Sequence, residues 1–297
     1  MIRKYIISPA KGWFKDKVKN VYLELESKKE DSPQNKSILY FPNQENENSY
    51  VITENNAESE LCELGLPVPP QHLWLGYGSN VSQYLNGRLQ ITNMLGILSA
   101  SGYDIKSVKR ILDFGCGAGR MIRWLKPFSD KSEIWGSDIS SEHIIWANNY
   151  LKPPFNFITN TVVPHLPFED KYFDLIYAGS VFTHIDDLTE AWLMELRRIL
   201  SKDGRLFITI HDKHTLELIE TKDKWKDSWL MKTMSKSKLY EEHKKNFNML
   251  VESRGPASQV FYDIDYFCRS VSNVFEVISV TPEAYGYQTG ILLKRKQ

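Results

Sequence analysis

Cysteine is scarce in this chain: the three present, Cys62, Cys116 and Cys268, stand far apart and form no C-x-x-C pair. An odd, scattered set of this kind excludes a disulfide framework and a zinc site, and we expect no bound metal. Long apolar runs are also missing, because no segment approaches the roughly 20 residues that span a bilayer. The apolar stretch near the N-terminus is too short for a signal peptide. We therefore expect a soluble, cytoplasmic protein.

An excess of charge of either sign is missing too. Lysine and arginine number 37, aspartate and glutamate also 37, and the pI is about 7.1. General nucleic-acid binders carry a basic excess or patch, so this balance predicts none of that activity. The lysine-rich stretch 222–245 is interrupted by acidic residues, which favours a solvated helix face over a binding patch. With 297 residues, the chain can form one large domain or two small ones.

The most informative segment that is present is Ile111–Arg120, which reads ILDFGCGAGR. An apolar run leads into Asp113 and then into three glycines at alternate positions, which predicts a buried strand, a tight turn and a helix N-terminus. A dinucleotide-binding fingerprint reads G-x-G-x-x-G, whereas here the third glycine comes one position early and Arg120 replaces the expected Gly or Ala. The G-K-[ST] end of a phosphate-binding P-loop is absent. The loop therefore predicts a nucleoside ligand without a pyrophosphate.

The same segment resembles motif I of the class I S-adenosylmethionine-dependent methyltransferases. Three further segments resemble, in order, the end of the second strand of that family, its fourth strand with the following loop, and the helix and turn before its fifth strand: Trp135–Asp138, Phe173–His184 and Trp192–Gly204. The resemblance covers residues 105–212, and more weakly 260–294. It implies an α/β fold with a seven-stranded Rossmann-like sheet, mostly parallel with an antiparallel last strand and helices on both faces. It also implies S-adenosyl-L-methionine as the cofactor.

Strand and helix patterns alternate from Val108 onward, as in a parallel sheet with right-handed crossovers. The predicted strands are 109–114, 133–137, 155–159, 172–178 and 204–211, then 274–281 and 287–294 around a turn at Gly286. The predicted helices are 84–101, 119–128, 141–150 and 187–201. We expect an irregular N-terminal extension over residues 1–65 and a methyltransferase domain over 66–297.

Two features of the predicted domain concern its helices. The helix 187–201 has Asp187 and Glu190 in a capping-box pattern and Gly204 after its last turn, so Asp186 and Asp187 are better explained by capping than by catalysis.

The stretch 213–258 breaks the alternation with a helical segment rich in Lys, Trp and Met. The position of this segment after the fifth strand favours a lid or an acceptor-binding insertion. A helix that merely covers the sheet would explain the same sequence pattern equally well.

The resemblance also assigns the donor-binding residues. The loop glycines would leave room for the methionine portion of the donor, and Asp113 would order the loop. Asp138, at a strand end, would accept hydrogen bonds from two ribose hydroxyls, although it could instead cap the next helix. Asn160 would contact the adenine amino group or serve only as a turn residue. The full predicted donor site is Asp113, Gly115, Cys116, Gly117, Gly119, Arg120, Asp138, Ile139, Asn160, Thr161, Ser180 and Phe182. Ser180 and Phe182 would line the donor pocket, and a plain core position explains Phe182 equally well.

Two histidines are candidates for a general base, because a neutral imidazole can remove a hydroxyl or amine proton near neutral pH. His184 and His211 both follow strands of the sheet, with His211 slightly preferred. His184 could instead tie its loop to the next helix, and His211 could be a strand-end histidine bonded to Asp212. Neighbours along a strand point to opposite faces, which argues against a His211–Asp212 dyad.

The sequence thus predicts an enzyme that transfers a methyl group from S-adenosylmethionine to an oxygen or nitrogen of a small-molecule or glycan-type acceptor. Two alternatives remain at this point: a donor-binding regulatory or scaffold module that has lost catalysis, and a nicotinamide-dependent oxidoreductase. The glycine spacing and Arg120 oppose the second alternative. Nothing in the sequence identifies the acceptor or the oligomeric state.

Overall fold

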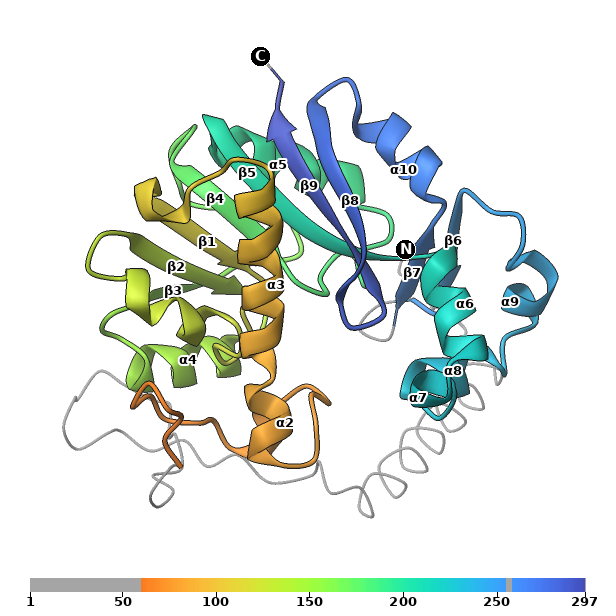
Figure 1. The fold of residues 1–297 in the computed structure, drawn as a ribbon, viewed down its shortest axis with the longest axis horizontal. Coiled ribbons are helices and arrows are strands. Elements are labelled where there is room, and N and C mark those ends of the chain that lie inside the picture. The colour runs from red at the N-terminus through yellow and green to blue at the C-terminus, as the bar shows by residue number, and fades with distance from the viewer. Residues whose placement is uncertain (1–59, 255–257, 297) are drawn as a thin grey trace, which may run out of the picture. The chain divides into compact units, whose positions relative to one another are not determined.

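The computed structural model describes residues 60–254 and 258–296, all of which belong to one compact unit (Figure 1). Most of the extension predicted over residues 1–65 lies outside the described residues. Within the described part of the chain, no helix is both long enough and apolar enough to cross a membrane.

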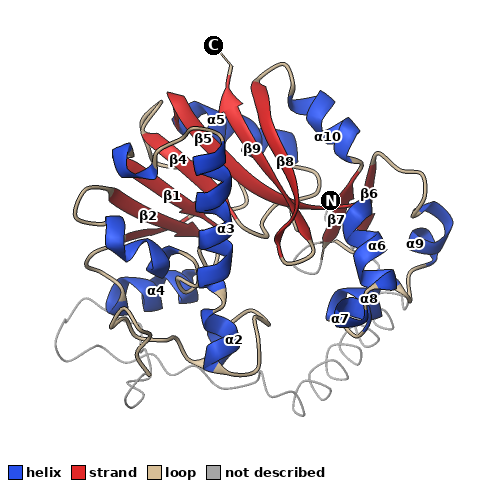
Figure 2. Ribbon diagram, in the orientation of Figure 1, coloured by secondary structure: helices blue, strands red, loops and turns tan. Residues whose placement is uncertain are grey.

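The centre of the unit is a sheet of seven strands in the order β3-β2-β1-β4-β5-β9-β8 (Figure 2). Its strands are β1 (Arg110–Phe114), β2 (Glu133–Asp138), β3 (Asn156–Thr159), β4 (Phe173–Ala178), β5 (Leu200–Asp212), β8 (Phe275–Tyr285) and β9 (Gln288–Arg295). The first five run parallel, and β9 runs antiparallel to both β5 and β8. The predicted fold class is therefore confirmed, including the antiparallel last strand.

Helices cover both faces of this sheet because successive residues of each buried strand point to opposite sides. Ile111 belongs to the hydrophobic core on one face and Leu112 to the core on the other. The first core is covered by α2 (Val81–Leu85), α3 (Gly87–Ala100), the 3₁₀ helix η3 (Ile122–Phe128) and α4 (Ser141–Tyr150). The second is covered by α5 (Thr189–Ile199) and α10 (Ile264–Val271). Two short 3₁₀ helices, η1 (Gln71–Leu73) and η2 (Ile105–Ser107), complete this part of the fold.

Two local predictions about helices are wrong. The segment predicted as a helix over 119–128 begins with turns at the glycine loop and becomes the 3₁₀ helix η3 only at Ile122. The predicted capping box of α5 does not form, because the N-cap residue is Leu188 and no side chain caps it. Asp186 and Asp187 instead accept hydrogen bonds from Arg254 Nη1 at 3.0 and 2.8 Å.

Gly204 also has a different role from the one predicted, because it lies inside β5 rather than after a helix. A Cβ at this position would approach the Asp174 carbonyl oxygen to 2.8 Å and Leu200 Cδ1 to 2.7 Å. The absent side chain therefore allows β5 to pass close to β4.

The insertion after β5 forms a small helical region with its own core. Its elements are α6 (Lys213–Thr221), α7 (Asp223–Lys226), α8 (Trp229–Met234), α9 (Lys238–His243), β6 (Met249–Glu252) and β7 (Gln259–Tyr262). Residues such as Ile219, Met234 and Tyr240 are fully buried in a third hydrophobic cluster, separate from the two that flank the sheet. The strand β7 pairs in parallel with the end of β5, with His211 opposite Phe261. The sequence predicted the helices of this segment and missed its two strands.

Candidate functional site

The glycine loop follows β1 at the edge of the sheet where the parallel strands end. Gly115, Gly117 and Gly119 all have positive φ angles, of 82°, 51° and 78°, which L side chains rarely adopt. A Cβ at Gly115 would also lie 2.3 Å from Val181 Cγ2, and one at Gly119 would lie 2.4 Å from Leu151 Cδ1. The loop conformation therefore requires glycine at these positions.

Asp138 fastens this loop to the neighbouring strand. Its Oδ2 accepts a hydrogen bond from the Gly117 N–H at 2.7 Å, and its Oδ1 accepts one from the Ser140 N–H at 2.8 Å. The side chain that caps α4 is that of Ser140, so the capping role considered for Asp138 falls to its neighbour. A carboxylate offers about four acceptor positions, so Asp138 retains capacity for further donors.

Asp113 is buried directly beneath the loop, with 2 % of its surface exposed. Burial raises its pKa to about 8, although the nearby Tyr177 hydroxyl partly opposes that shift. Asp113 and Tyr177 lie opposite each other on β1 and β4, yet Asp113 Oδ2 makes no well-formed hydrogen bond with any described residue. The structure thus leaves a buried polar atom available at the base of the loop.

A second available atom and a set of exposed apolar side chains follow β2 and β3. Asn160 Oδ1 is buried without a hydrogen-bond partner among the described residues, while Asn160 Nδ2 donates to the Thr161 carbonyl at 3.1 Å. Ile139 is 57 % exposed, and Val162 and Val163 are 63 % and 61 % exposed. Apolar side chains next to an unpaired acceptor suit a flat heterocycle that carries an amino group.

Arg120 and Cys116 hold the loop in place. The Arg120 guanidinium lies 4.1 Å from the centre of the Tyr77 ring and donates to the Tyr285 hydroxyl at 2.9 Å. It also donates to Gln90 Oε1 at 3.1 Å, so this arginine connects the loop to α3 and to the end of β8. Cys116 is buried, and burial raises the pKa of its thiol well above the usual value, which disfavours the reactive thiolate.

Ser180 and Phe182 lie after β4 in different environments. Ser180 has a positive φ of 60°, its N–H donates to Thr209 Oγ1, and its Oγ accepts from Gln288 Nε2 at 2.8 Å. Phe182 is fully buried in the core that also contains Trp192. Phe182 therefore has the core position that the sequence left open.

The two candidate histidines have contrasting surroundings. His211 is 2 % exposed, and neither ring nitrogen has a hydrogen-bond partner among the described residues. Burial, and to a smaller degree His184, lowers the His211 pKa to about 3. His184 is exposed, and its Nδ1 lies 2.8 Å from the Ser258 carbonyl oxygen. A carbonyl only accepts, so this contact favours a proton on Nδ1 and an acceptor at Nε2, whereas Gln259 Nε2, 3.3 Å from the same Nδ1, favours the other tautomer.

Asp212 does not orient His211. Its Oδ1 accepts from the Thr215 N–H at the start of α6, and its Oδ2 accepts from Thr289 Oγ1 at 2.7 Å. The two neighbours point to opposite sides of β5, as the alternation along a strand predicts.

Several aromatic residues near this edge were not singled out in the sequence. Tyr287 lies 5.7 Å from the His211 ring and 4.9 Å from Trp225, measured between ring centres. Tyr77 and Tyr285 are in edge contact at 6.4 Å. The available signal was the glycine beside each tyrosine, as in Gly76-Tyr77-Gly78 and Tyr285-Gly286-Tyr287, which marks turns rather than a binding role.

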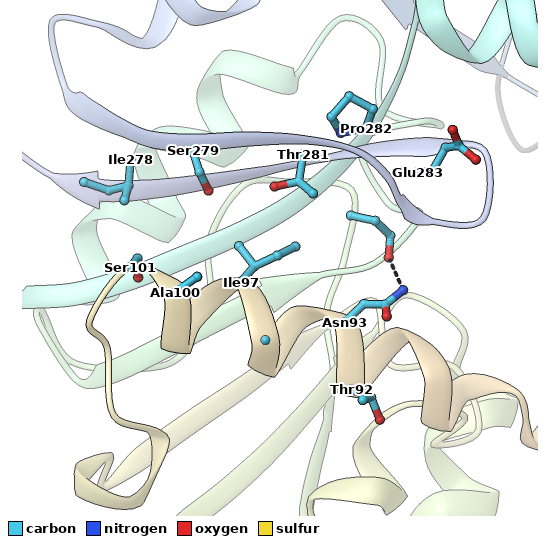
Figure 3. Close-up of a pocket in the computed structure, with 12 residues that line it drawn as sticks. Thr92, Asn93, Ile97, Ala100, Ser101, Ile278, Ser279, Thr281, Pro282 and Glu283 are labelled. Carbon is cyan, nitrogen blue, oxygen red and sulfur yellow. Dashed lines mark hydrogen bonds between the residues drawn. The ribbon is translucent and has the colours of Figure 1, made fainter.

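A separate hollow of about 610 Å³ lies between α3 and β8 (Figure 3). Asn93 of α3 reaches across it and donates to the Ala284 carbonyl at 3.3 Å. None of the motif residues lines this hollow, which is therefore distinct from the glycine-loop site. Within the described residues, no group of His, Cys, Asp or Glu is arranged to hold a metal ion.

The strand order, the glycine loop after β1 and the acidic residue at the end of β2 together define a Rossmann-like methyltransferase fold. Comparison with known proteins agrees: residues 112–208 match the family model described as "Methyltransferase domain". Residues 112–208 are therefore similar to a methyltransferase domain, in agreement with the predicted class I S-adenosylmethionine-dependent methyltransferase fold.

Two curated relatives each match about a third of this chain. A demethylmenaquinone methyltransferase of Thermotoga maritima is 36 % identical over 100 residues, covering 34 % of this chain and 42 % of the relative. A sterol 24-C-methyltransferase of Schizosaccharomyces pombe is 32 % identical over 105 residues, covering 34 % and 27 %. The chain thus spans less than half the length of these relatives. Among solved structures, the PH0226 protein of Pyrococcus horikoshii superposes with a TM-score of 0.54 at 21 % identity, covering 74 % of this chain and 95 % of that one, which shows a shared fold.

Proposed function

We propose that this chain transfers the methyl group of S-adenosylmethionine to an oxygen or nitrogen of a small-molecule or glycan-type acceptor. The observation that carries this proposal is the fastening of the glycine loop to Asp138 by the Gly117 N–H. That bond orients the carboxylate at the edge where the unpaired atoms Asp113 Oδ2 and Asn160 Oδ1 also lie. The donor is an adenosine that carries an amino-acid chain. It needs a loop without bulky side chains for that chain, a carboxylate such as Asp138 for the ribose, and an amide oxygen such as that of Asn160 for the adenine.

Each part of the donor has candidate partners among these residues. The loop of Gly115, Cys116, Gly117 and Gly119 would take the methionine portion, with Asp113 below it and Arg120 bracing it. The free acceptor positions of Asp138 would take the ribose hydroxyls. Ile139, Asn160 and Thr161 would contact the adenine, and Ser180 would border the donor from β4.

The donor supplies a methyl group already activated on a sulfonium, so the protein mainly contributes positioning and exclusion of water. Where the acceptor needs to lose a proton, His184 is now the better candidate base. Its Nε2 is the free acceptor nitrogen when Nδ1 donates to the Ser258 carbonyl. His211, with a pKa of about 3, suits hydrogen bonding better than deprotonation.

The insertion from α6 to β7 would enclose the acceptor. It has its own hydrophobic core and joins the sheet beside His211 at the end of β5. This arrangement supports the role of a lid or acceptor-binding region over that of a simple covering helix.

Calorimetric titration tests the donor assignment. We expect S-adenosylmethionine and S-adenosylhomocysteine to bind, and NAD to bind much more weakly, because the loop lacks the dinucleotide glycine spacing. NAD binding as tight as that of the donor would overturn the proposal. Formation of S-adenosylhomocysteine with a panel of acceptors then distinguishes an enzyme from a module that only binds the donor.

A further inference from the structure

The carboxyl end of β5 is surrounded by rings from three different segments. His211 lies 4.9 Å from Phe261 of β7 and 5.7 Å from Tyr287 of the β8–β9 turn, and Trp225 of α7 lies 4.9 Å from Tyr287. We call His211, Phe261, Tyr287 and Trp225 the aromatic cluster. Phe261 is fully buried, whereas Tyr287 and Trp225 are partly exposed. The cluster therefore extends from the interior to the surface between the sheet and the insertion.

His211 is an unusual member of this cluster because it is polar, buried and unpaired. Neither Nδ1 nor Nε2 has a hydrogen-bond partner in the part of the chain that the structure describes. An unpaired buried polar group costs about 1–3 kcal/mol, so most such groups find a partner. A ligand with a hydrogen-bonding group would supply one.

The surroundings of the cluster also limit the charge of such a ligand. Burial dominates the shifts of the His211 and Tyr287 pKa values, and the smaller contributions come from the His184 imidazole and the Tyr77 phenol; no carboxylate, lysine or arginine contributes. Asp212 faces away, toward Thr215 and Thr289. Lys224 Nζ lies 4.5 Å from the centre of the Trp225 ring, at the outer end of the cluster. At the inner end, beside His211, a charged ligand group would lose its hydration without gaining a counter-charge.

We infer that the acceptor is a neutral, planar ring carrying a hydroxyl group, which stacks in the aromatic cluster while His211 hydrogen-bonds the hydroxyl. This inference rests on the proposed function and narrows its acceptor. His211 is then a positioning residue: the imidazole holds the oxygen in place and does not remove its proton. The ring would enter from the side of Trp225 and Tyr287, since those two side chains form the outer, partly exposed part of the cluster.

A sugar fits this cluster less well, even though aromatic side chains can also cover a sugar ring. A hexose carries several hydroxyl groups, and each one left unpaired after burial is costly. Of the four cluster residues, only His211, the Tyr287 hydroxyl and the Trp225 indole N–H can form hydrogen bonds. A ring with a single hydroxyl needs only one of them.

Equilibrium binding of matched ring pairs tests the inference. The probes are 2-naphthol and 7-hydroxycoumarin, their hydroxyl-free counterparts naphthalene and coumarin, and methyl glucopyranoside, each titrated with and without saturating S-adenosylhomocysteine. We expect the hydroxyl group to improve binding by roughly tenfold in the wild type. In His211→Phe this advantage disappears, and in His211→Gln, which keeps a hydrogen-bonding amide, it is largely restored. His243→Phe, an exposed histidine of the same insertion, is the matched control and leaves binding unchanged.

Each alternative result has a definite meaning. Equal binding of the hydroxylated rings by the wild type and His211→Phe overturns the inference, as does tighter binding of the glucoside or binding of none of the rings. If S-adenosylhomocysteine does not bind, the proposed function is wrong. The ring titrations carried out without S-adenosylhomocysteine still show whether the aromatic cluster binds rings. Melting temperatures of all variants separate loss of the site from loss of the fold.

Discussion

At the scale of single residues, the site depends on the backbone N–H of Gly117 and on the carboxylate that it meets, that of Asp138. Asp138 binds the Gly117 N–H, and Gly117 reaches it because its φ of 51° is open to glycine at little cost. The carboxylate and the loop are thus one unit, in which either partner positions the other.

Asp138→Ala is expected to weaken donor binding by more than about tenfold, because hydrogen bonds to a charged group contribute about 1.5–3 kcal/mol. Calorimetric titration with S-adenosylmethionine provides the measurement. The control is Asp203→Ala, whose side chain is 86 % exposed and distant from the loop motif in sequence. A folded Asp138→Ala variant with unchanged donor affinity would show that Asp138 only shapes the loop.

Gly117→Val is expected to weaken donor binding by more than about tenfold as well, since a β-branched residue is strained at a positive φ. The nearest atom to an added Cβ is Leu75 Cδ1 at 3.5 Å, so the space itself tolerates a small side chain. The loss should therefore come from altered loop geometry, detected by the same titration. Unaltered affinity would mean that the loop does not contact the donor.

At the scale of elements, α5 is anchored by one arginine near its C-terminal end. Arg198 Nη2 donates to Glu195 Oε1 at 2.6 Å and to the Leu166 carbonyl, and Arg198 Nη1 donates to the Phe168 carbonyl. Burial raises the Glu195 pKa, but Arg198 and the Leu166 N–H outweigh this effect and leave that pKa lowered. The network fastens the helix to the segment before β4.

Arg198→Met is expected to lower the free energy of unfolding by about 3 kcal/mol, because it leaves the Glu195 carboxylate buried without its partner. The Glu195 side chain is 7 % exposed and that of Arg198 is 29 % exposed. Lys226→Met is the matched control: it removes a pair with the same sequence spacing, but its side chains are 52 % and 95 % exposed. Urea unfolding should show a change within about 0.5 kcal/mol for the control. Equal effects of both substitutions would refute the anchoring role.

The elements also show how far the sequence could predict this structure. Strands β1, β2 and β4 were located to within a residue or two, because buried parallel strands are continuous apolar runs. The strands β6 and β7 were missed, since each has only four residues and β7 joins the sheet by pairing with β5, with Phe261 opposite the distant His211. The cap of α5 was predicted wrongly because Arg254, 67 residues from Asp187, competes for the same carboxylates. Tertiary contacts of this kind leave no local pattern.

Some parts of the candidate site could be predicted from the sequence and others could not. Backbone requirements place glycines and an acidic residue at fixed spacing, so the loop and Asp138 were located from sequence. The state of His211 was not, because its burial depends on Phe261 and Tyr287, which other segments bring together.

At the scale of the whole molecule, two buried titratable groups make folding depend on pH in opposite directions. Burial raises the Asp113 pKa from 3.8 to about 8, so the folded protein binds more protons than the unfolded chain between these values, and stability falls as pH rises. Burial lowers the His211 pKa from 6.5 to about 3, so the unfolded chain binds more protons in that window, and stability rises with pH.

Substituting each group by a neutral one of similar shape should isolate its contribution. For Asp113→Asn, the stability difference from wild type should change in favour of the variant as pH rises from 6.5 to 8, by at most about 1.4 kcal/mol per pH unit. His211 is present in both proteins, so its contribution cancels in this difference. For His211→Phe, the difference should favour the variant increasingly as pH falls below 6.5 toward 3, and should level off about one pH unit above 6.5.

The two slopes overlap between pH 3.8 and 6.5, where they oppose each other in the wild type. Relative to the parent, Asp113→Asn should therefore make stability rise more steeply with pH in that window and His211→Phe should make it rise less steeply, and the double variant should return to the parental slope. Urea unfolding of the four proteins at half-unit pH steps measures this. Parallel profiles for all four would mean that Asp113 and His211 titrate in the folded protein as they do in the unfolded chain, and that water reaches both groups. That result would also contradict the acceptor inference, which requires His211 to be buried and uncharged.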